Sequence, residues 1–96
     1  MNPSSALELH SQTIQRLANL HRTTNPRVFS STAIDRATER SDLDLLVDAL
    51  PGATLLDLGA LQVELEALLG VKVDLLTPGD LPPAFRDQVL AEARPI

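Results

Sequence analysis

The stretch "SDLDLLV", residues 41–47, decides the fold, because acidic and apolar side chains alternate in it ahead of a run of Leu and Val. Alternation of this kind is typical of a β-strand with one face toward a core. It puts Asp42 and Asp44 on one face, about 6–7 Å apart at a rise of about 3.3 Å per residue. That separation suits one divalent ion, or two ions in a bridged pair. An ordinary strand that begins with solvated acids would show the same separation.

Turn and capping signals divide the rest of the chain into helices and strands. We expect a helix at 4–22, opened by a Ser5–Glu8 capping box and stopped by "TTNP" at 23–26, and a short strand at 27–31. The pattern continues with a strand at 42–50, a helix at 53–70, a strand at 71–77 and a helix at 83–93. This order predicts one α+β domain over residues 1–96, a small mixed β-sheet with helices packed on it.

The strand at 42–50, the helix at 53–70 and the strand at 71–77 together have the length of a parallel crossover unit. Thr54 with Asp57 predicts the start of its helix, and Gly70 predicts the end. The helix carries a leucine stripe expected to face the core: Leu55, Leu58, Leu61, Leu65 and Leu68 or Leu69. Asp48 is interpreted as a strand-end acid on the Leu43 face.

A third carboxylate belongs to the strand at 71–77, in "KVDLL". If the two strands of the crossover are neighbours, Asp74 can point to the same face as Asp42 and Asp44. Carboxylate oxygens are the ligands that Mg²⁺ prefers, so the three acids together predict a magnesium site. The simpler alternative is a solvated Asp74 paired with Lys72 on its own strand.

Hydroxyl and guanidinium groups precede the acidic pair. Ser30 and Ser31 end the short strand, where hydroxyls and free amides can contact phosphate. Arg36 and Arg40, four residues apart, can bind phosphate if their segment is helical. Serines that simply end a strand, and arginines that are simply solvated, are the alternatives.

Composition narrows the classes of function. The formal net charge is −5, with 13 acidic and eight basic residues, which argues against direct nucleic-acid binding. No apolar run approaches the roughly 20 residues that cross a bilayer, so we expect no membrane association. The chain has no cysteine, which excludes disulfides and is compatible with a cytoplasmic location, where we place it. A thin core leaves room for a homo-oligomer or a hetero-oligomer contact.

The spacing of these residues resembles that of the minimal nucleotidyltransferases, small members of the DNA polymerase β-like superfamily. In that family Gly-Ser is followed by about ten residues, Asp-x-Asp, and a third Asp on a later strand. Here ten residues separate Ser31 from Asp42-Leu43-Asp44, and "KVDLLTPGDLP" at 72–82 looks like the third-carboxylate strand with its turn. The resemblance covers roughly residues 5–95 and implies a polymerase β-like nucleotidyltransferase core.

The resemblance also implies a function. Family members serve as the antitoxin of a toxin–antitoxin module, transferring AMP from ATP to a tyrosine of a HEPN ribonuclease toxin. It implies Mg²⁺ and ATP as cofactors and the HEPN toxin as partner. Asp42, Asp44 and Asp74 would bind metal, and Asp74 would help to deprotonate or orient the tyrosyl oxygen. Ser31, with the backbone near Ser30, would contact the phosphates.

Three positions depart from the family pattern. Ser30 replaces the glycine, and Ile34 and Asp35 replace an Arg-Gly pair. A Cβ at residue 30 crowds the triphosphate and Asp35 repels it, although Arg36 can compensate. A catalytically degenerate fold that neutralises its HEPN partner by binding alone is therefore the alternative. Transfer of nucleotides to an RNA or an antibiotic is a third, weaker one.

Overall fold

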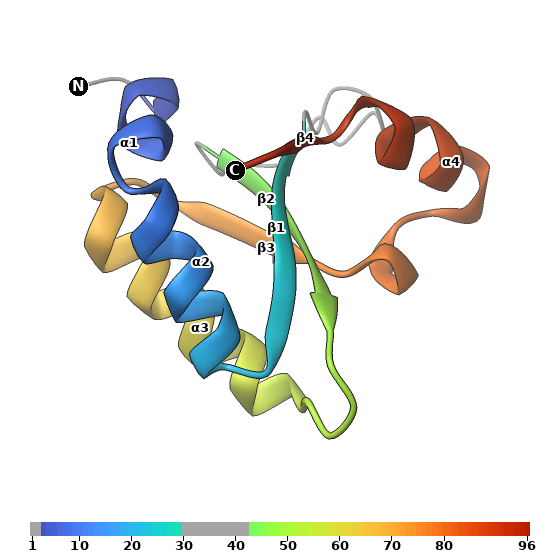
Figure 1. The fold of residues 1–96 in the computed structure, drawn as a ribbon. Coiled ribbons are helices and arrows are strands. Elements are labelled where there is room, and N and C mark those ends of the chain that lie inside the picture. The colour runs from blue at the N-terminus through green and yellow to red at the C-terminus, as the bar shows by residue number, and fades with distance from the viewer. Residues whose placement is uncertain (1–2, 30–42) are drawn as a thin grey trace.

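The computed structural model of the chain describes residues 3–29 and 43–96. The described helices are α1 (Pro3–Leu9), α2 (Ser11–Leu20), α3 (Leu55–Leu69) and α4 (Pro83–Glu92), with a 3₁₀ turn η2 at Pro78–Asp80. The described strands are β1 (Thr23–Phe29), β2 (Leu43–Ala49), β3 (Val73–Leu76) and β4 (Arg94–Pro95). The predicted mixed α+β class is confirmed, and the helices flank a central sheet (Figure 1).

The sheet has four strands in the order β3-β2-β1-β4. β2 and β3 are parallel, whereas β1 is antiparallel to both β2 and β4. The two parallel strands are joined through α3, as the crossover length predicts. Because β2 lies between β1 and β3, its side chains are flanked by another strand on both sides.

β2 has a core on each of its faces, which explains its near-continuous burial. One cluster joins the sheet to α2 and α3; its largest fully buried side chains are Ile14, Leu45, Leu61 and Leu65. The other cluster joins the sheet to η2 and α4 and contains Phe29, Leu46, Leu81 and Val89. Figure 1 shows α1, α2 and α3 on one side of the sheet and α4 on the other. The predicted alternation along β2 is therefore confirmed.

α3 begins and ends at the residues that the sequence predicts. The Thr54 hydroxyl accepts from the Asp57 amide at 3.3 Å, and the Asp57 carboxylate accepts from the Thr54 amide at 2.9 Å. This reciprocal capping box satisfies two amides that the first turn leaves free. Gly70 closes the helix in the left-handed region at φ 70, which costs glycine little. The prediction that Leu55 faces the core is wrong, since Leu55 is 84% exposed.

The N-terminal third differs from the prediction in two ways. One helix was expected at 4–22, but a break at His10 separates α1 from α2, and Ser5 lies inside α1 rather than at its cap. The break lets Ala6 and Leu7 of α1 join the same core cluster as α2. The segment 23–26 belongs to β1, because a register shift between Thr24 and Arg27 takes up Pro26 within the strand.

The described helices include none that is both long and apolar enough to cross a lipid bilayer. The longest of them, α3, has 15 residues. It falls short of the roughly 20 that a bilayer requires.

Candidate functional site

Asp44 and Asp74 lie side by side on neighbouring parallel strands. Their Cα atoms are register partners between β2 and β3. Parallel strands are about 4.8 Å apart and register partners share a face, so the two carboxylates leave the sheet as neighbours. The Leu43 amide donates to the Lys72 carbonyl at 3.1 Å, which holds the start of β2 against the start of β3. The expected juxtaposition of Asp44 and Asp74 is therefore present.

The surroundings of this pair are apolar on one side and shielded from solvent. Asp44 is 7% exposed, and the Oδ2 atom of Asp74 is buried. On the β1 side, the register partner of Asp44 is Phe29, itself 8% exposed. Transferring a carboxylate out of water is costly, and two carboxylates beside one another repel. A cation at this position offsets both penalties, so the donor set fits a divalent ion that prefers oxygen ligands.

Phe29 and Leu43, which border the residues that the structure does not describe, both lie beside this pair. Phe29, the last described residue before the gap, is paired with Asp44, and Leu43, the first one after it, directly precedes Asp44. The other predicted site residues, Ser30, Ser31, Arg36 and Asp42, lie outside the described residues. Within 3–29 and 43–96, no group of three His, Cys, Asp or Glu side chains could hold a metal ion. The proposed triad therefore depends on Asp42 for its third member.

An ion pair on the same face of the sheet was missed by sequence reasoning. Asp48 Oδ1 accepts from Arg27 Nη2 at 2.6 Å, and Asp48 Oδ2 accepts from Asn25 Nδ2 at 3.1 Å. Arg27 is the register partner of Leu46, which places the pair on the Asp44 face. The assignment of Asp48 to the Leu43 face is thus wrong, and counting alternate positions from Asp44 gives the observed face. Since Asp48 binds Arg27, it is part of the strand pairing and not of the acidic pair.

Comparisons with known proteins bear on the family and the fold of the chain. The sequence model of the family described as nucleotidyltransferase domain matches residues 10–96. A protein of Methanocaldococcus jannaschii, named "Putative protein adenylyltransferase", is 44% identical over 66 residues, which cover 69% of the chain and 71% of that protein. Protein adenylyltransferase MntA of Thermococcus cleftensis is 42% identical over 65 residues, covering 68% of the chain and 66% of that protein.

Solved structures that are similar to this chain carry related descriptions. A structure described as a "putative minimal nucleotidyltransferase" superposes with a TM-score of 0.79 at 43% identity, over 100% of this chain and 97% of that one. A chain of a toxin–antitoxin complex, MntA with HpeT, superposes with a TM-score of 0.63 over 90% of this chain and 69% of that one. Its identity is 18%, so this second similarity is one of fold alone.

Proposed function

Because the chain belongs to the nucleotidyltransferase-domain family, we propose that it is a Mg²⁺-dependent protein adenylyltransferase, the antitoxin of a toxin–antitoxin pair. The observation that carries the proposal is the in-register pair Asp44 and Asp74 on one face of the sheet. Relatives named as protein adenylyltransferases support the reaction type. Two carboxylates that leave one face of the sheet side by side suit phosphoryl chemistry, in which positioning and charge neutralisation lower the barrier.

The proposal also specifies the donor of the AMP group and the residue that accepts it. One structural neighbour is a complex of MntA with the toxin HpeT, and another is a toxin–antitoxin structure with AMP-PNP, an ATP analogue. These neighbours support ATP as the donor and a toxin protein as the partner. We assign the acceptor to a tyrosine of a HEPN-domain toxin, following the family resemblance.

The three carboxylates share one role in the proposed reaction, and Asp74 has a second one. Asp42, Asp44 and Asp74 would hold Mg²⁺, which would neutralise charge on the triphosphate when it is bound. Asp74 accepts a hydrogen bond from the tyrosyl hydroxyl and takes its proton. The tyrosyl oxygen then attacks the α-phosphorus, the bond from that phosphorus to the bridging oxygen breaks, and pyrophosphate leaves. Phe29, the register partner of Asp44 on β1, makes that side of the pair apolar.

We assign the remaining site residues to binding of the triphosphate. The Ser31 hydroxyl and the backbone near Ser30 bind the β- and γ-phosphates, and Arg36 offsets their charge. These roles come from the family spacing, in which ten residues separate Ser31 from Asp42.

Binding without catalysis is the second candidate function, and a specific observation favours it. Ser30 occupies the position of the family's glycine, and Asp35 adds a negative charge where the family has a basic or flexible residue. Both changes weaken triphosphate binding while they leave Asp42, Asp44 and Asp74 in the sequence. A chain of this kind would neutralise its toxin by forming a complex.

Neutralisation of the toxin in cells separates the two candidates. The double change Asp42→Asn and Asp44→Asn removes two carboxylates with little change in side-chain volume. Catalysis requires them, so we expect the toxin to regain its activity with this variant, while Asp87→Asn, an exposed acid on α4, neutralises it like the wild type. If the double variant still neutralises the toxin fully, binding suffices and the enzymatic proposal fails as the main mechanism.

A further inference from the structure

Glu66 of α3 makes a hydrogen bond that crosses from the helix to the sheet. Its carboxylate Oε2 accepts from the Val73 amide at 2.9 Å, and the bond is partly buried. The backbone carbonyl of Glu66 also accepts from the Gly70 amide at 2.9 Å, which ends the helix. α3 ends at Leu69 and β3 begins at Val73, so only residues 70–72 connect them. Glu66 therefore binds this connection at both of its ends.

The Val73 amide lies on the open side of the sheet. Among the described strands β3 is an edge strand, with β2 as its one neighbour. The Lys72 carbonyl points toward β2, where it accepts from the Leu43 amide at 3.1 Å. Successive residues of a strand direct their N–H and C=O groups to opposite sides, so the Val73 amide points away from β2. The Glu66 carboxylate thus binds the amide from the side that no described strand covers.

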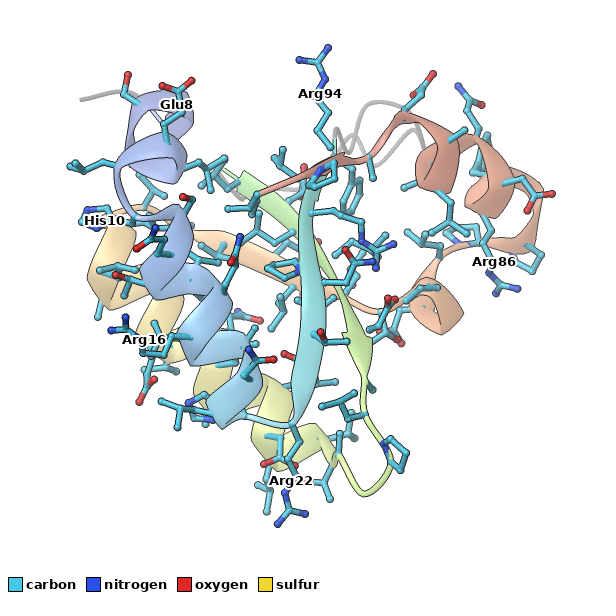
Figure 2. All side chains as sticks on the ribbon, viewed as in Figure 1. Glu8, His10, Arg16, Arg22, Arg86 and Arg94 are labelled. Atoms are coloured by element: carbon cyan, nitrogen blue, oxygen red, sulfur yellow. The ribbon has the colours of Figure 1, made fainter. Side chains whose placement is uncertain are left out.

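This amide directly precedes Asp74, which is the second of the four residues of β3. The first residues of a short edge strand are held by a neighbouring strand on one side only, so they open more readily than the centre of a sheet. Side chains fill the space between α3 and the sheet (Figure 2), and Val73 is one of them. That packing holds the Val73 side chain, whereas the bond from Glu66 holds its backbone.

Glu66 stands where a carboxylate does not favour the helix itself. It belongs to the last turn of α3, which has no basic residue. The carbonyl end of a helix is negative, so an acid there lowers helix stability unless another contact offsets the effect. The bond to Val73 is such a contact. Glu64, two residues earlier, contacts α2 instead, where its carboxylate lies 3.0 Å from Nε2 of His21. The two acids therefore differ in the element that each one holds.

We propose that Glu66 is a positioning residue for Asp74: by holding the Val73 amide, it keeps the start of β3, and with it the Asp74 carboxylate, beside Asp44. The inference rests on the proposed function, because it assigns what Asp74 needs in order to act there. Glu66 acts through the backbone and does not touch the substrate. A misplacement of about 1 Å at a reacting group can lower a rate about 10²-fold, so a bond next to Asp74 can matter for the reaction.

Amide hydrogen exchange of the full chain, measured without metal or toxin, tests the positioning by itself. The decisive amide is that of Asp74, because the Val73 amide loses its acceptor directly in Glu66→Ala. We expect this variant to speed exchange at Asp74 at least about tenfold relative to Leu45 of β2, since a hydrogen bond to a charged group contributes about that factor. Glu66→Gln keeps an acceptor oxygen and Glu64→Ala keeps Glu66, so both should protect Asp74. Faster exchange at Val73 alone, or an equal effect of Glu64→Ala, overturns the proposal.

The rate of adenylyl transfer to the toxin tests the consequence for the reaction. Glu66→Ala should lower the maximal rate at least about tenfold and raise the Mg²⁺ concentration that gives half of it, whereas Glu66→Gln and Glu64→Ala should stay close to the wild type. A mere loss of folded chain would lower the maximal rate and leave the Mg²⁺ requirement unchanged, and that result overturns the proposal. A wild type that transfers no AMP refutes the proposed function instead, and the hydrogen exchange of Asp74 then decides the positioning.

Discussion

At the scale of single residues, the acidic pair places two like charges side by side, and the proposed cation would offset their repulsion. Asp44 is 7% exposed and lies in register with Asp74, so two like charges share a shielded part of the sheet. On the other side, the register partner of Asp44 is the apolar residue Phe29. Under the proposed function, the acidic pair trades stability for binding, as is common where charged groups are gathered to bind a ligand.

The first prediction concerns the response of stability to Mg²⁺. Without divalent ions, Asp74→Asn should unfold at a higher temperature than the wild type, because it removes the repulsion with Asp44. With Mg²⁺ at a hundred times its dissociation constant, the wild type should gain about 2.7 kcal/mol, and each 1 kcal/mol raises the midpoint by about 4–8 °C. Thermal unfolding in EDTA and in Mg²⁺ measures both effects.

Asp87→Asn is the control for this prediction, since it makes the same substitution at an exposed acid of α4. It should keep the full response to Mg²⁺, whereas Asp74→Asn should lose most of it. An equal response of the wild type and Asp74→Asn would show that the stabilising ion binds elsewhere.

At the scale of elements, both ends of α3 are fixed by local chemistry. Gly70 ends the helix at φ 70, and a Cβ built there meets no atom within 4 Å. The cost of a side chain at this residue is therefore one of backbone conformation alone. Gly59 lies in the middle of the same helix, and a Cβ there is also free of contacts within one chain.

The second prediction compares the same substitution at these two glycines. Gly70→Ala should lower the free energy of unfolding by about 1–2 kcal/mol, because the left-handed region is unfavourable for alanine. Gly59→Ala should raise it by about 0.5–1 kcal/mol, because alanine loses less entropy in a helix. Urea unfolding at several protein concentrations measures both changes and separates them from self-association. Changes of the same sign in the two variants would contradict this account of the helix end.

The elements that sequence reasoning predicted well are those that local signals define. The Thr54–Asp57 capping box and Gly70 gave the bounds of α3, because each acts within one helical turn. The start of β1 was missed because it depends on pairing with β2. Asn25 adopts φ 55 there and its side chain binds Asp48, a contact 23 residues away in sequence. The break between α1 and α2 likewise depends on packing that no local pattern encodes.

At the scale of the whole molecule, the sheet is stabilised from both sides. Leu45 and Leu46 are adjacent in β2 and both 0% exposed, yet they belong to different core clusters. A sheet with only one covered face would leave one of them in water. The cover supplied by α4 and η2 is therefore part of the core, and it borders the face that carries Asp44.

The third prediction tests this two-sided core. Leu45→Ala and Leu46→Ala should each lower the free energy of unfolding by about 2–5 kcal/mol, because each leaves a cavity in a packed cluster. Leu50→Ala, at a side chain that is 39% exposed, should cost much less. Urea unfolding measures all three. A cost for Leu46→Ala no greater than that for Leu50→Ala would mean that α4 does not pack on the sheet.

Sequence reasoning predicted the arrangement of the acidic pair but not the pairing of all four strands. Strand alternation and the crossover length were enough to place Asp74 beside Asp44, because parallel strands joined by one helix are usually neighbours. The pairing of β4 with β1 could not be derived, since it joins Arg94 to Val28 across most of the chain. The roles of Ser30, Ser31, Arg36 and Asp42 stay predictions, because these residues lie outside the described part of the structure.

The most direct test of the central claim is the intact mass of the toxin partner after incubation with this chain, ATP and Mg²⁺. We predict that the toxin gains the mass of one or more adenylyl groups on tyrosine, that EDTA prevents the gain, and that Asp74→Asn abolishes it while Asp87→Asn does not. A toxin that forms a complex with the chain but gains no mass, or that gains as much with Asp74→Asn as with the wild type, would contradict the claim.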